Sequence, residues 1–241
     1  AFTLLKLIRY TENKTSEAYV DAVISAYCEL LSKFNELGAE WVQFDEPYLV
    51  HDVDDEDIHL FEKLYNGILL VKGNVKVLLQ TYFGDVRDCY KNICTLAFDG
   101  IGLDFIEGRQ TKTLLKANGF PKDKLLFAGV VNGKNIWRNN YKNTLEILNE
   151  LKTYGIETVI GTSCSLLHVP YTLENEVRLQ KKYRDHFAFA LEKLTELTEL
   201  KVLSETDYTH SKFYINNEKL FQGRPDCDDA KVKKRTAEIK Y

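Results

Sequence analysis

The sequence contains no methionine, and no initiator residue precedes the first structural segment. The chain opens directly on Phe2–Leu7, an apolar run typical of a β-strand. From these two observations we expect the chain to be a piece of a longer polypeptide.

Cysteine is scarce, and its spacing excludes a disulfide framework. The five cysteines are an odd number, lie far apart and form no C-x-x-C pair (Cys28, Cys89, Cys94, Cys164, Cys227). Small secreted domains that depend on disulfides usually carry an even number of closely spaced cysteines. The pattern therefore predicts a cytoplasmic protein.

Neither an excess of basic residues nor a long apolar run is present. Thirty-two Lys and Arg against 36 Asp and Glu give a net charge of −4, so nothing indicates a nucleic-acid partner. No apolar run approaches the ~20 residues of a membrane-spanning helix, and we expect no membrane partner. The 241 residues, 44% of them hydrophobic, are sufficient for a globular core.

Apolar segments typical of strands alternate with segments of helical periodicity, which predicts an α/β protein with a parallel sheet. The six expected strands are Phe2–Leu7, Trp41–Phe44, Val75–Thr81, Gly100–Phe105, Leu125–Val131 and Thr158–Thr162. Eight such βα units make a (β/α)₈ barrel of ~250 residues. The six units form either an open sheet or a TIM-type barrel whose first two strands precede residue 1. The absence of a G-x-G-x-x-G motif weakens a nucleotide-binding doubly wound sheet, so we expect the barrel.

The carboxyl-terminal part of the sequence predicts one long helix and then a polar tail. Leu173–Leu200 has helical periodicity, with Tyr183, Phe187, Leu191, Leu194 and Leu197 on its apolar face. We assign residues 1–200 to six βα units and residues 201–241 to a polar tail. In this tail we expect a turn at 223–226 and a solvated helix face at Lys231–Arg235. The acidic stretch Asp52–Asp57 is expected to form the solvated first turn of a helix.

Polar residues follow the expected strands at the edge where barrel enzymes place their active sites. This candidate polar ring comprises Asp45, Glu46, Asp104, Asn132, Arg138, Cys164 and His168. Each member also has a purely structural interpretation. Asp45 and Glu46 can cap the turn before Pro47, Arg138 can stack on its neighbour, and Cys164 can be a small buried residue. Cys164 and His168 can also form a catalytic pair or two metal ligands, but no local motif completes a zinc site.

We expect Asp45 and Glu46 to accept hydrogen bonds from neighbouring loops. Replacement of Asp45 by Ala is then expected to reduce stability by about 1–3 kcal/mol.

Four segments resemble motifs of the cobalamin-independent methionine synthase family and occur in the family's order. They are GAEWVQFDEP at 38–47, GVVNGKNIWR at 129–138, SCSLLHVP at 163–170 and GRPDC at 223–227. The resemblance runs through essentially the whole chain and is to the amino-terminal one of the family's two (β/α)₈ barrels. It implies that residues 201–241 begin the linker between the barrels.

The resemblance also implies an activity for the whole protein: transfer of a methyl group from 5-methyltetrahydrofolate polyglutamate to homocysteine. Zinc and homocysteine would bind to the carboxy-terminal barrel, which is the implied partner of this chain. The family's zinc ligands are a His-x-Cys pair, a Glu and a Cys. Internal similarity between the barrels aligns them with residues 81–83, Asp104 and Cys164, where only one carboxylate and one thiol remain. We therefore expect no catalytic residue, no cofactor and no functional zinc in this chain, with His168 as the one possible third ligand.

Two other functions stay open at this point. The chain can be a stand-alone zinc-thiolate methyltransferase that uses the polar ring, or a metal-free barrel that binds a small carboxylated ligand through Arg138 and nearby asparagines.

Overall fold

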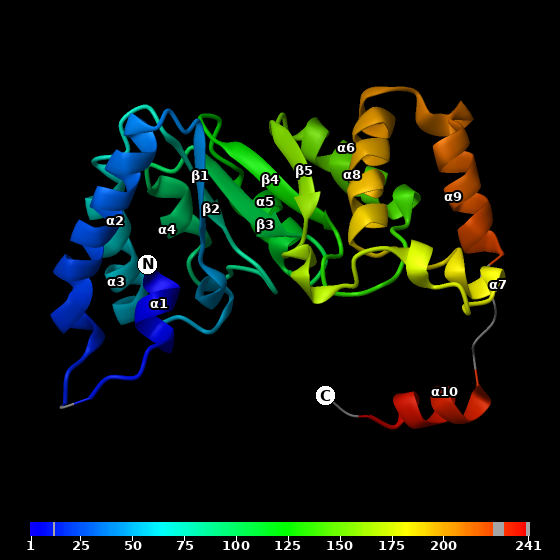
Figure 1. The fold of residues 1–241 in the computed structure, drawn as a ribbon, viewed down its shortest axis with the longest axis horizontal. Helices are drawn as coiled ribbons and strands as arrows, with labels where there is room; N and C mark the ends of the chain where they lie inside the picture. The colour runs from blue at the N-terminus through cyan, green and yellow to red at the C-terminus, as the bar shows by residue number, and fades with distance from the viewer. Residues whose placement is uncertain (12, 224–228, 240–241) are drawn as a thin grey trace.

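The computed structural model describes residues 1–11, 13–223 and 229–239, which form a curved parallel sheet with helices on its outer side (Figure 1). The strands are β1 (Trp41–Asp45), β2 (Lys76–Gln80), β3 (Gly100–Asp104), β4 (Leu125–Val131) and β5 (Thr158–Thr162). The helices are α1 (Phe2–Leu7), α2 (Val20–Glu36), α3 (Asp55–Leu69), α4 (Tyr90–Thr95), α5 (Thr111–Asn118), α6 (Tyr141–Thr153), α7 (Lys181–Arg184), α8 (Ala190–Glu205), α9 (Lys212–Gln222) and α10 (Ala230–Ala237).

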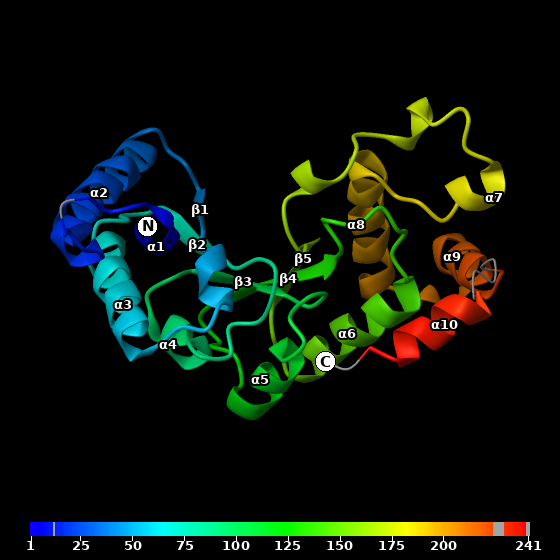
Figure 2. The same cartoon turned by 90° about the horizontal axis from the view of Figure 1, so that it is seen from below.

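The strands lie in the order β1-β2-β3-β4-β5, and every neighbouring pair is parallel. Because βα crossovers are right-handed, an order that never reverses places the connecting helices on one face of the sheet. Figure 2 shows these helices around the outer side of the curved sheet, with the side between β1 and β5 open. The expected parallel α/β architecture is confirmed, with five strands where six were expected.

Alternation along the strands separates an outer face from an inner face. The outer side chains of the central strands are buried against the helices (Val77, Leu79, Ile101, Leu103, Leu126, Ala128). On the inner face, side chains from neighbouring strands occupy the space above the glycines of β3. A Cβ atom on Gly102 would lie 2.0 Å from Oε1 of Gln80, and one on Gly100 would lie 2.7 Å from the ring of Phe127. The inner face therefore packs tightly at its centre.

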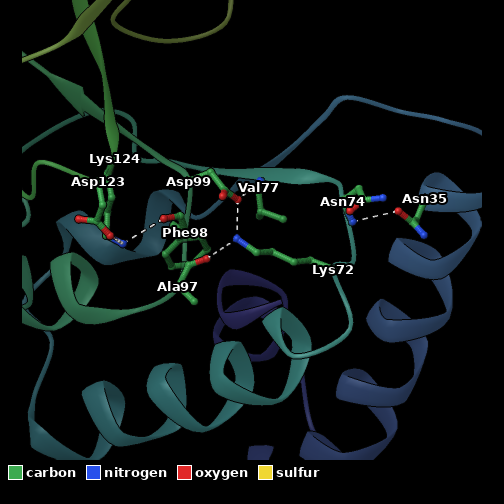
Figure 3. Close-up of polar contacts among 9 residues, drawn as sticks. All are labelled: Asn35, Lys72, Asn74, Val77, Ala97, Phe98, Asp99, Asp123 and Lys124. Carbon is green, nitrogen blue, oxygen red and sulfur yellow. Dashed lines mark hydrogen bonds and ion pairs between the residues drawn. The ribbon is translucent and has the colours of Figure 1, made fainter.

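Polar side chains brace the amino-terminal edge of the sheet (Figure 3). The Lys72 ammonium donates to Oδ2 of Asp99 at 2.6 Å and to the Ala97 carbonyl at 2.8 Å. The same Asp99 oxygen accepts from the Val77 backbone at 2.7 Å. The buried Lys124 ammonium donates to the Phe98 carbonyl at 3.0 Å. These bonds satisfy loop carbonyls at the amino-terminal edge of the sheet.

The ends of several helices have the expected chemistry. The side chain of Asp54 accepts from the backbone of Asp57 at 2.9 Å, which confirms the acidic stretch as the first turn of α3. Gly119 ends α5 with a φ of 71°, a conformation that glycine adopts at little cost.

The prediction of a strand at Phe2–Leu7 is wrong, because this segment is helix α1. The buried carboxylate of Glu46 accepts hydrogen bonds from the backbone N–H groups of Phe2 at 2.8 Å and Thr3 at 2.6 Å. First-turn N–H groups have no partner within a helix. Glu46, 44 positions from Phe2, supplies that partner, so the local sequence does not predict the helix.

The single long helix predicted at Leu173–Leu200 is also wrong. The segment contains a 3₁₀ turn at Leu173–Asn175, the short α7 and then α8. The Glu192 side chain accepts from the backbone of Phe189 at 3.0 Å and of Leu173 at 3.1 Å. These bonds satisfy an N–H at the start of α8 and hold the preceding segment against it.

The tail contains further helices beyond α8. The basic run Lys231–Arg235 lies on α10 and is exposed, as expected of a solvated helix face. The turn expected at 223–226 lies largely outside the described residues. Among the residues described, no helix has the length and apolar character needed to span a membrane.

Candidate functional site

The carboxyl ends of the strands bring three members of the predicted ring to one edge of the sheet: Asp45 at β1, Asp104 at β3 and Cys164 after β5. The exposed Asp45 accepts from the Gln43 amide at 2.7 Å, and the same amide nitrogen donates to the Tyr82 hydroxyl oxygen at 2.9 Å. Burial and the nearby Asp45 carboxylate raise the pKa of Tyr82 to about 12. This part of the edge is a hydrogen-bonded group with a neutral phenol at its centre.

Asp104 is a buried carboxylate of this edge, with 1% of its surface exposed. Its Oδ1 accepts from the backbone N–H groups of Ile106 at 2.7 Å and Glu107 at 2.9 Å. Oδ2 is buried and has no partner among the described residues. Burial raises the pKa of Asp104 despite these backbone bonds. One oxygen thus shapes the β3–α5 loop and the other is left unsatisfied.

Cys164 and His168 do not form the pair that their spacing allowed. The Cys164 thiol is buried, and its sulfur lies 3.8 Å from the Ser165 carbonyl. Burial raises the pKa of Cys164, which disfavours the thiolate that a nucleophile or a metal ligand requires. The His168 ring packs edge-on against Phe83, with ring centroids 5.6 Å apart.

Asn132 follows β4 at this same edge, and its turn lies close to Cys164, whereas Arg138 and Glu46 have other surroundings. Oδ1 of Asn132 accepts from the backbone of Lys134 and Asn135, both at 2.9 Å, and so forms the turn after β4. Arg138 lies further along this loop, where its guanidinium faces a cavity beside α8 and α9. Glu46 is fully buried beneath α1.

Asp45 and Glu46 both accept hydrogen bonds, but from different kinds of donor. Glu46 accepts from backbone donors, although these belong to a helix and not to a loop. Asp45 is exposed and accepts from Gln43 of its own strand. We therefore expect the larger loss of stability on substitution at Glu46 and not, as the sequence predicted, at Asp45.

The residues of this edge do not fit a metal ion. Within the described residues, no group of three or more His, Cys, Asp or Glu side chains could hold one. A catalytic zinc site needs three protein ligands. Asp104 and Cys164 supply two donors at most, and Oδ1 of Asp104 and the Cys164 thiol already contact backbone groups.

Comparison with known proteins identifies the family. Residues 1–155 match the family described as the N-terminal domain of cobalamin-independent synthase. The chain belongs to this family.

Curated relatives agree with this assignment and are much longer. A protein of Campylobacter jejuni subsp. jejuni (strain 81-176), named 5-methyltetrahydropteroyltriglutamate--homocysteine methyltransferase, is 47% identical over 239 residues, which are 99% of this chain and 32% of that protein. Proteins of the same name from Lactococcus lactis subsp. lactis (strain IL1403) and subsp. cremoris (strain SK11) are 48% and 53% identical over 97% and 83% of this chain, and over 30% and 26% of their own lengths. The chain thus spans about a third of the length of these relatives.

The sequence did not predict a second polar cluster, which consists of Lys193 and Glu196 on α8. Lys193 and Glu196 are almost completely buried, although both are charged residues. The Lys193 ammonium donates to the Trp137 carbonyl at 3.1 Å, and Oε1 of Glu196 accepts from the backbone of Asn139 at 2.9 Å. Lys193 and Glu196 are three residues apart, and the buried Leu200 and Leu203 continue the same helix face. This helical spacing is the sequence feature that could have predicted their burial.

Proposed function

We propose that this chain is part of the amino-terminal barrel of a cobalamin-independent methionine synthase. The observation that carries the proposal is its alignment: 99% of the chain matches 32% of a relative that is named as the methyltransferase. The family model that it matches describes an N-terminal domain. The whole enzyme would transfer a methyl group from 5-methyltetrahydropteroyltriglutamate to homocysteine, the two compounds in the relatives' name.

Within that enzyme the chain would act as a scaffold and not supply the reacting groups. The thiol of Cys164 has a raised pKa, and Asp104 is engaged in holding its loop. We assign the zinc, which would hold homocysteine as a thiolate nucleophile, to the carboxy-terminal barrel. The residues here would shape the folate cleft and support that barrel, and residues 201–241 would begin the linker.

We also propose that the five strands are an arc of a (β/α)₈ barrel. A sheet with an unreversed strand order and helices on one face is the arrangement of such a barrel. Since Phe2–Leu7 is a helix, three strands, and not two, would complete the barrel. The inner-face side chain of Val159 on β5 is 38% exposed, as expected where a further strand would cover it.

The test is an assay of methionine formation that compares the whole polypeptide, this chain alone and the remainder of the polypeptide with and without this chain. We expect activity from the whole polypeptide, none from the chain alone, and greater activity of the remainder when the chain is added. A Cys164→Ser variant of the whole polypeptide should keep its activity. Methyl transfer by the chain alone, or one tightly bound zinc per chain that is lost in Cys164→Ser, would overturn the proposal.

A further inference from the structure

A cavity of about 470 Å³ is lined by residues of α6, α7, α8 and α9 and by Arg138 of the loop after β4. Figure 1 shows α8 and α9 side by side, with α7 close to one end of α9. Arg138, Tyr141 and Glu199 line one part of the cavity, and Phe213 and Leu220 of α9 line another. Its volume is within the range of small-molecule sites.

The charged groups around the cavity are unequally satisfied. Lys181 and Asp185 form an ion pair with each other, and one oxygen of Glu199 accepts from the Tyr141 hydroxyl. In contrast, the Nε atom of Arg138 is buried and has no hydrogen-bond partner in the described part of the chain. A guanidinium is always charged and presents donors that match a carboxylate. A residue that lines the cavity thus carries a positive charge and one donor without a partner among the described residues.

The wall that carries Arg138 is held in place by buried hydrogen bonds. Oδ1 of Asn217 accepts from the backbone of Tyr141, and its Nδ2 donates to the Asn139 carbonyl, both at 2.9 Å. Glu196 binds the Asn139 backbone from the side of α8. These contacts join α9 and α8 to the loop after β4, so the backbone beside Arg138 is held in place.

The lining of the cavity combines groups of different chemistry. Arg138 offers donors for a carboxylate, and Glu199 offers its second oxygen to a cation. Phe213 and Leu220 supply apolar surface from the facing helix. A ligand that satisfies all of them carries a carboxylate, an ammonium group and an apolar side chain.

We propose that this cavity binds a free α-amino acid with an apolar side chain. The carboxylate binds Arg138, the ammonium group binds Glu199, and the side chain packs against Phe213 and Leu220. This binding involves no chemical step and does not depend on the proposed methyltransferase function, because the residues of the carboxyl edge take no part in it.

The test is calorimetric titration of the chain with L-leucine and two matched analogues. 4-Methylpentanoate lacks the ammonium group, and 3-methylbutylamine lacks the carboxylate. We expect L-leucine to bind more tightly than either analogue. Arg138→Met should weaken binding of L-leucine and of the acid by about 10- to 100-fold, the usual effect of losing a charged hydrogen-bonding partner. Glu199→Gln should weaken L-leucine and the amine but leave the acid unchanged.

Two further variants keep the result interpretable. Arg178→Met removes an exposed arginine outside the cavity and should bind L-leucine like the parent chain. Asn216→Trp fills the cavity from its exposed rim and should abolish binding without altering a buried charge, so it decides the question if Arg138→Met does not fold. The absence of L-leucine binding up to about 50 mM, or binding that survives both Arg138→Met and Asn216→Trp, would overturn the proposal.

Discussion

Two glutamates are buried among the described residues, and their hydrogen-bond partners differ. Glu46 accepts from backbone N–H groups of α1 through both oxygens and also from the Tyr65 hydroxyl. Glu196 accepts one backbone hydrogen bond, and its Oε2 has no partner in the described residues. Hydrogen bonds to a carboxylate favour its charged form, whereas burial without them disfavours it. The two residues should therefore respond differently to substitution.

Glu46→Gln should lower the free energy of unfolding by about 1–3 kcal/mol. The substitution replaces one acceptor oxygen by an NH₂ group that faces the N–H donors of α1. Urea denaturation followed by circular dichroism measures the effect. Asp45→Asn is the matched control, since an exposed side chain should change stability by less than about 0.5 kcal/mol. Equal losses in the two variants would show that α1 does not depend on the Glu46 carboxylate.

Glu196 should make the chain less stable as the pH rises. Burial raises its pKa to about 7, against an ordinary value of 4.5, although Lys193 and Arg138 act in the opposite direction and Glu199 adds repulsion. Between these two values the folded state binds more protons than the unfolded state. Stability is therefore lost as the pH increases from 4.5 through 7, by up to about 3 kcal/mol.

Glu196→Gln removes this titration, so its pH profile of unfolding free energy should lack that decline. The exposed Glu174→Gln should keep the profile of the parent chain. Parallel profiles for the parent chain and Glu196→Gln would contradict the assignment.

At the scale of elements, α8 has an inward face that contradicts its sequence pattern. The predicted apolar face included Leu191 and Leu194, which are 37% and 49% exposed. The face that packs against the rest of the described chain carries Lys193, Glu196, Leu200 and Leu203. Polar loop groups near the start of the helix accommodate the two charged residues, and apolar contacts hold the other end.

Leu200→Ala should therefore cost about 2–5 kcal/mol in unfolding free energy, because it leaves a cavity in the core. Leu194→Ala, the same chemical change on the opposite face of α8, should cost less than about 0.5 kcal/mol in this chain. Thermal or urea denaturation of both variants checks the difference. A larger loss of unfolding free energy for Leu194→Ala than for Leu200→Ala would show that the face predicted from the sequence is the one that packs inward.

At the scale of the whole molecule, the curved sheet has two unpaired edges, one on β1 and one on β5 of the described chain. Unpaired strand edges with apolar side chains favour pairing with other chains. On β5, the exposed Val159 contributes such a side chain.

We expect the chain to associate as its concentration increases, and Val159→Lys to weaken this association because a charged edge resists strand pairing. Sedimentation velocity over a concentration series measures the effect. Arg178→Met, far from the sheet edge in sequence and exposed, is the control. A parent chain that stays monomeric at all concentrations would show that these edges are already protected.

The sequence by itself determined the five strands of the described sheet, their parallel pairing and the chemistry of several helix ends. Strands such as Leu125–Val131 are apolar throughout because both faces are covered, and caps such as Asp54 act on groups three residues away. It also determined the family, through short motifs that occur in order.

Only the tertiary structure decided what depends on distant partners. Glu46 makes Phe2–Leu7 a helix, although the segment is apolar enough to be a strand. Loop carbonyl and N–H groups allow charged residues onto the inner face of α8. The residues of the predicted polar ring lie apart for the same reason. Asp45, Asp104 and Cys164 lie at the carboxyl ends of strands, whereas Arg138 lies in the loop after β4 and lines the cavity beside α9. Residue type and spacing specify local hydrogen bonds and alternation, but burial and long-range partners are specified only when the chain has packed.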